Sequence, residues 1–102
     1  MDIELARQHW EAGERRIEAA RSSPRRYAQL RRRVDQVTGE LRRRIGQVFT
    51  MDELAEVYSG ADSWVGELLE DADPESPPVT EPGTIADAAF HSYARGASDY
   101  RP

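Results

Sequence analysis

The side chains best suited to acid–base or metal chemistry are few and scattered. His9 and His91 are the only histidines, and neither has a second ligating residue at a spacing typical of a metal site. The acidic run at 71–75 begins like a calcium loop, but its sixth position is Ser76 instead of glycine. Cysteine is absent, which excludes thiolate chemistry and disulfides. We therefore expect no catalytic site, metal or cofactor.

The basic residues offer a different chemistry, which is the binding of anions. All 14 are arginine, and the absence of lysine and asparagine suggests a GC-rich bacterial coding sequence. Arginine recognises carboxylates and phosphates through paired hydrogen bonds. Two triplets are spaced by 11 residues, close to three helical turns, so they project on similar faces of one helix. These triplets are Arg31, Arg32, Arg33, Arg42, Arg43 and Arg44.

Three interpretations of the triplets stay open. They bind an acidic surface of another protein, or they bind nucleic acid through its phosphates. Alternatively, they are the solvated exterior of a helix, with ion pairs at helical spacing such as Glu40 with Arg44. Sequence-specific reading of DNA is not expected, because no aromatic or asparagine side chains are interleaved and the whole chain carries a net charge of −5.

The 102 residues form two halves of opposite charge. Residues 1–46 hold 12 arginines and 7 acidic residues, and residues 47–102 hold 2 arginines and 12 acidic residues. Such halves either fold onto each other or meet different partners. Every apolar run is far too short to cross a bilayer, and no signal-peptide pattern opens the chain. We therefore expect a soluble cytoplasmic protein with no membrane partner.

Residues 1–48 are predicted to form a basic helical hairpin. Apolar or small residues recur every three or four positions on both sides of a break at 21–23, and Pro24 favours the start of a second helix. Folding the two segments back on each other pairs small residues with large ones, which favours an antiparallel coiled coil. The paired positions are Ala20 with Tyr27, Ile17 with Leu30, Gly13 with Val34, Trp10 with Val37 and Ala6 with Leu41.

Residues 49–72 are predicted to form an acidic third helix. Thr50 and Glu53 have the spacing of a capping box, and Phe49 with Leu54 has that of a hydrophobic staple. A kink or break at 59–60 leaves open whether this segment is one helix or two. We expect the helix to pack against the open end of the hairpin. Its apolar side chains Trp64, Leu68 and Leu69 would then form a protein-docking patch.

The last third of the chain is predicted to be a linker and a short helix. Residues 71–83 hold four prolines among acidic residues and read as a flexible linker. Residues 84–102 then give a short helix, carrying Phe90 and Tyr93, and a tail. So short a helix is marginal alone, so it must dock on its own chain or on another molecule. Both possibilities stay open.

These elements predict an all-α protein and favour a non-enzymatic function. The leading hypothesis is a small adaptor that binds a larger protein assembly, first of all the transcription machinery. The hairpin resembles, in architecture only, the coiled-coil finger of transcript-cleavage factors that enter RNA polymerase. Their fingertips are acidic, whereas residues 21–26 here are rich in arginine. The alternatives are nonspecific nucleic-acid binding by the hairpin, or a self-assembling helical bundle in which two hairpins pair.

Overall fold

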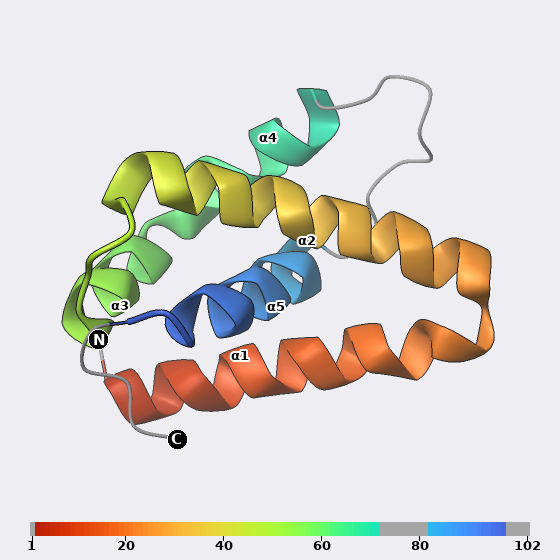
Figure 1. Ribbon diagram of the computed structural model, residues 1–102, viewed down its shortest axis with the longest axis horizontal. Coiled ribbons are helices and arrows are strands. Elements are labelled where there is room, and N and C mark those ends of the chain that lie inside the picture. The colour runs from red at the N-terminus through yellow and green to blue at the C-terminus, as the bar shows by residue number, and fades with distance from the viewer. Residues whose placement is uncertain (1, 72–81, 98–102) are drawn as a thin grey trace.

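The computed structural model describes residues 2–71 and 82–97, and within them every regular element is helical (Figure 1). The predicted all-α class is therefore confirmed. The α-helices are α1 (Ile3–Glu18), α2 (Pro24–Ile45), α3 (Met51–Ser59), α4 (Val65–Asp71) and α5 (Pro82–Ala94). Two short 3₁₀ turns, η1 (Ala19–Ser22) and η2 (Ala61–Ser63), connect α1 to α2 and α3 to α4.

Local sequence signals set the helix starts. The side chain of Asp2 accepts a hydrogen bond from the Glu4 backbone N–H at 3.0 Å, which caps α1. Pro24 is the first residue of α2. At α3 the Glu53 backbone N–H donates to Thr50 Oγ1 at 3.2 Å, and the Thr50 hydroxyl in turn donates to the Glu53 carboxylate at 3.3 Å. The predicted capping pair is therefore confirmed.

The first two helices run antiparallel and are joined by the η1 turn, but α5 lies between them (Figure 1). Most of the tertiary contact of α1 is with α5, and α2 also packs mainly on α5. The predicted seam residues Trp10, Ile17, Val34, Val37 and Leu41 are buried, as a packed hairpin requires. Direct pairing of α1 with α2 along a coiled-coil seam is not confirmed, because α5 occupies much of the space between them.

Small residues let α1 and α5 approach closely. A Cβ atom added at Gly13 would lie 3.0 Å from both the Thr84 carbonyl oxygen and the Ala88 backbone nitrogen, and nearer still to Asp87 Cβ. Such distances are shorter than real Cβ contacts, so α1 must carry glycine at this crossing. The predicted pairing of Gly13 with Val34 is therefore replaced by a contact with the backbone of α5.

Aromatic side chains from both halves of the chain fill the core. Trp10 of α1 stacks on Phe90 of α5 with ring centroids 5.8 Å apart, and Tyr58 of α3 meets both rings edge-on. About one turn further along α5 the ring of Tyr93 stacks on Phe49, with centroids 4.6 Å apart. The aromatic rings of the terminal helix thus join it to three other parts of the fold.

The segments between the helices differ in part from the expected ones. Residues 49–71 form two helices, because Gly60 follows the end of α3 and η2 separates it from α4. Val48, expected on the hairpin seam, is 84% exposed because α2 ends before Gly46, a glycine with a φ of 87°. Of the predicted linker 71–83, residues 72–81 lie outside the described residues, and Pro82 and Gly83 belong to α5.

Candidate partner-binding surface

Three of the six predicted arginines hold helices together. Arg33 is 8% exposed, and its Nη1 donates to the Leu69 carbonyl oxygen in α4 at 2.9 Å. Arg31 is half-buried and pairs with Glu14 of α1 at 2.8 Å from Nη1 to Oε1. These two residues connect α2 to α4 and to α1 respectively.

Arg44 is the third of these structural arginines. Its Nε donates to Glu40 Oε1 at 3.1 Å, one helical turn earlier, and its guanidinium carbon lies 4.4 Å from the centre of the Trp64 ring. A guanidinium at this distance is attracted by the electron-rich ring face. Arg44 therefore connects the end of α2 to the segment that leads into α4.

The other three arginines of the triplets lie on the outer face of α2. Arg32, Arg42 and Arg43 are all exposed. Arg43 contacts Glu40 Oε2 at 3.2 Å but keeps 81% of its side chain exposed, so this ion pair is worth little. The exposed residues Arg25 and Gln29 precede them on the same helix. We name Arg25, Arg32, Arg42 and Arg43 the α2 outer face.

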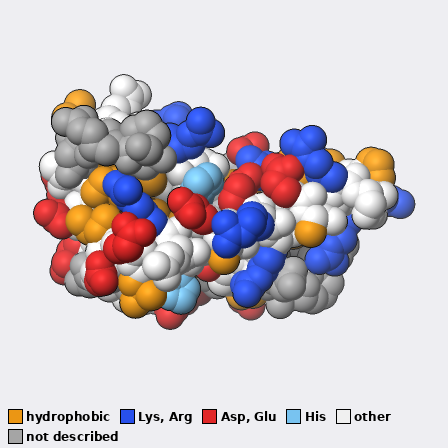
Figure 2. Space-filling view, turned by 90° about the horizontal axis from the view of Figure 1, so that it is seen from below, with side chains coloured by type: hydrophobic (Ala, Val, Ile, Leu, Met, Phe, Trp, Pro, Cys, Tyr) orange, Lys and Arg blue, Asp and Glu red, His pale blue; other side chains and the backbone are white. Residues whose placement is uncertain are grey.

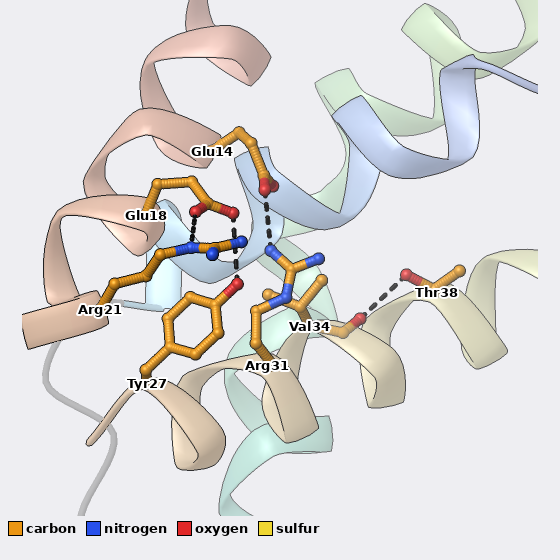
Figure 3. A network of polar contacts seen from close by, with 7 residues as sticks. All are labelled: Glu14, Glu18, Arg21, Tyr27, Arg31, Val34 and Thr38. Carbon is orange, nitrogen blue, oxygen red and sulfur yellow. Dashed lines mark hydrogen bonds and ion pairs between the residues drawn. The ribbon is translucent and has the colours of Figure 1, made fainter. Parts of the chain in front are cut away.

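A polar network fixes the turn between α1 and α2 (Figure 3). Glu18 accepts hydrogen bonds from Arg21 Nε and, at 3.2 Å, from the Tyr27 hydroxyl. These contacts, the one with Arg21 foremost, lower the pKa of the Glu18 carboxyl. The neighbouring Arg31–Glu14 pair spans the same two helices. The turn therefore has its own side-chain contacts, although most groups in it are exposed.

Charge is distributed along the long axis of the molecule. Figure 2, seen from the α1 side, shows arginines gathered towards the turn end, with acidic side chains more abundant towards the other end. At that other end a groove of about 500 Å³ runs between α2 and α3. Asp52, Glu53 and Glu56 line it together with Arg44, Ile45 and Val57. On this face positive charge therefore predominates near the turn, while the groove at the other end is mainly acidic but also includes Arg44.

The other predicted interaction residues are mostly part of the core. Leu69 is 1% exposed, Phe90 is fully buried and Tyr93 is buried against Phe49. Trp64 and Leu68 are half-buried and pack against the core. The structure therefore brings Trp64 and Leu68 to the edge of the fold, and it places the other three where they hold α4 and α5 in position.

A partly buried polar pair joins α3 to α5. The Tyr58 hydroxyl donates to Asp87 Oδ1. Burial raises the pKa of the Asp87 carboxyl, while this hydrogen bond and the nearby charges of His9 and Arg16 oppose that rise. Burial and the carboxylate also raise the pKa of Tyr58. Asp87 also lies where α5 passes closest to Gly13, so this hydrogen bond links α3 to the contact between α1 and α5.

A second, smaller pocket brings together residues that no sequence pattern would group. It lies beside Arg42, and its wall includes Phe49 and Tyr93. Thr38, Gln47 and Ser92 contribute polar groups from three different segments. No local spacing could have revealed this pocket, because α5 meets the end of α2 only in the folded chain.

In the part of the chain that the structure describes, no three potential metal ligands lie together. None of the helices there has the length and the apolar composition of a membrane span. No known protein family, curated protein or solved structure matches this chain.

Proposed function

We propose that the protein is a small, non-enzymatic helical adaptor that binds an acidic surface of a larger protein assembly through the α2 outer face. The observation that carries the proposal is the division of the arginine triplets. Arg31, Arg33 and Arg44 each contact another segment of the fold, although Arg44 keeps 43% of its side chain exposed. Arg32, Arg42 and Arg43 are exposed on the same helix, and Arg43 is paired with Glu40 of that helix. Contacts between segments account for the first set but not for the second.

The geometry of α2 supports recognition of an extended surface. The helix has 22 residues, about 33 Å at 1.5 Å per residue. Arg32 and Arg43 are 11 residues apart, so about 16 Å of helix separates two positive charges on similar sides. Contacts with α1, α4 and α5 hold the opposite side of the helix, which keeps this spacing fixed. Arginines presented on a rigid helix lose less entropy when they bind carboxylates.

The transcription machinery is the first assembly to test, with RNA polymerase as the bait. The experiment compares immobilised wild-type protein with the double variant Arg32→Gln, Arg43→Gln. The matched control is Arg15→Gln, Arg95→Gln, which removes the same charge from exposed positions off the α2 outer face. Retention of purified bacterial RNA polymerase, and of proteins from a native extract, is measured at equal salt.

We expect the Arg32→Gln, Arg43→Gln variant to lose the retained assembly and the matched control to keep it. Equal retention by both variants would refute binding through the α2 outer face. Nucleic-acid binding is measured in parallel with random-sequence DNA and RNA. Affinity that falls steeply with salt and is lost equally in both double variants would instead favour nonspecific phosphate binding. Light scattering across concentrations tests the self-assembled bundle.

A further inference from the structure

The small pocket at the end of α2 has one aromatic wall and one polar wall. Its volume is about 280 Å³, and it lies between the last turns of α2, the loop that follows, and the end of α5. The stacked rings of Phe49 and Tyr93 form the aromatic wall. The Tyr93 hydroxyl donates to the Gly46 carbonyl oxygen, so the ring is held in place from the loop side.

The polar wall carries a positive charge. Arg42 lies at the pocket, and its charge lowers the pKa of Tyr93 against the larger effect of burial, which raises it. Gln47 and Ser92 add an amide and a hydroxyl that can donate hydrogen bonds. Thr38 also lines the pocket, but its hydroxyl already donates to the Val34 carbonyl oxygen at 2.9 Å. Among the described residues that line the pocket, none is acidic.

We propose that this pocket binds a carboxylate carried on a flat or apolar carbon frame. The guanidinium of Arg42 matches a carboxylate in shape and in charge, and it can form two parallel hydrogen bonds with it. The Phe49–Tyr93 wall gives the carbon frame an apolar surface. A phosphate is a poorer match, because its charge of nearly two at neutral pH would be met by one guanidinium only.

Such a carboxylate has two sources. It is either a free small acid or an acidic side chain of a bound partner. If the carboxylate belongs to a partner's side chain, the inference rests on the proposed function. The pocket is then the place where that side chain anchors the partner, because Arg42 belongs to the α2 outer face. The chemistry of recognition is the same in both cases, and the test distinguishes the sources.

The test uses amide chemical shifts of the full-length protein during titration. Phenylacetate is the free acid, phenylacetamide is its uncharged counterpart, and a poly-glutamate peptide represents an acidic partner. The expected result is a saturable shift at Gln47, Ser92 and Gly96 with an acid and none with phenylacetamide. Saturation with phenylacetate indicates a free-acid site, and saturation with the peptide alone indicates a partner anchor.

Two arginine variants provide the comparison. Arg42→Gln is expected to weaken carboxylate binding by about tenfold, as loss of a charged hydrogen-bond partner does. Arg15→Gln removes the same charge from an exposed position on α1, outside both the pocket wall and the α2 outer face, so it is expected to retain the affinity. The amide spectra without ligand establish that both variants are folded. Both side chains are exposed, so neither change should disturb the core.

Three results would overturn the inference. These are no saturable shift with either acid, equal affinity for phenylacetamide, or equal loss in the two arginine variants. Failure of the proposed function is recognised separately, because its test uses Arg32 and Arg43 instead of Arg42. A pocket that binds phenylacetate while the double variant keeps the assembly would sustain the pocket and refute the adaptor surface.

Discussion

The α1–α5 contact and the α2 outer face represent two opposite uses of a helix surface. At the first, Gly13 and the small residues of α5 bring two backbones together and bury almost every side chain. At the second, α2 leaves long charged side chains in solvent. From this comparison we expect stability to depend mainly on packing against α5, and the charged surface to tolerate change without loss of the fold.

Removal of a large core side chain should have the largest effect. Phe90 is fully buried between Trp10 and Tyr58. Phe90→Ala is expected to lower the free energy of unfolding by about 3–5 kcal/mol, because it removes apolar contacts and leaves a cavity. Urea denaturation followed by circular dichroism measures this. A loss below about 1 kcal/mol would show that α5 contributes little to the fold, and Leu5→Ala at an exposed site is the control.

Two glycine-to-alanine changes should alter stability in opposite directions. Gly13→Ala forces a Cβ against the backbone of α5, and overpacking of this kind is expected to cost about 1–3 kcal/mol. Gly39→Ala lies in α2, and apart from the backbone of its own helix and its chain neighbours no atom lies within 4 Å of the new Cβ. It is expected to gain up to about 1 kcal/mol, because alanine favours the helix. Denaturant midpoints of both variants test this, and a Gly13→Ala variant as stable as the wild type would contradict the close approach.

Adjacent arginines should separate packing from surface charge. Arg33→Gln would leave the Leu69 carbonyl oxygen without its buried donor, at a cost of about 1–3 kcal/mol. Arg32→Gln changes an exposed side chain and is expected to stay within about 0.5 kcal/mol of the wild type. Thermal unfolding of the two variants under one buffer gives the comparison. Similar values for both would mean that the Arg33 contact contributes nothing to stability.

The Tyr58–Asp87 pair should give a smaller, pH-dependent effect. Because burial raises the pKa of Asp87 in the folded protein, the folded state holds this proton more tightly than the unfolded state does. The contribution of Asp87 to stability therefore falls as pH rises from its unfolded pKa through the raised folded value. Asp87→Asn still accepts the Tyr58 hydrogen bond but carries no charge.

We therefore expect Asp87→Asn to gain stability relative to the wild type as pH rises through that window. The free energy of unfolding of both proteins, measured from pH 3 to pH 8, tests the sign. The charged and titratable groups that face Asp87 are Tyr58, His9, Arg16 and Asp62. His9→Gln serves as the control for the effect of the neighbouring imidazole on Asp87. A stability difference that runs the other way would mean that hydrogen bonding outweighs burial.

Local signals in the sequence predicted much of the secondary structure. The proline at the start of α2 and the Thr50–Glu53 pair marked helix starts that the structure confirms. Seam positions such as Trp10, Ile17 and Val37 are buried as expected. Such signals depend on neighbours within one helical turn, so the sequence displays them directly. Position 59–60 remained ambiguous because glycine both ends helices and is tolerated within them.

The sequence alone determined the helical class, the helix starts, the opposite charge of the two halves and the placing of arginine triplets on one helix. Only the tertiary structure decided which helix fills the space between α1 and α2, which arginines face inward, and which distant residues form the pocket beside Arg42. The physical reason is that hydrophobic periodicity indicates which face of a helix is buried, but not which other helix covers that face. An arginine becomes structural or exposed only when another part of the chain brings an acceptor to it.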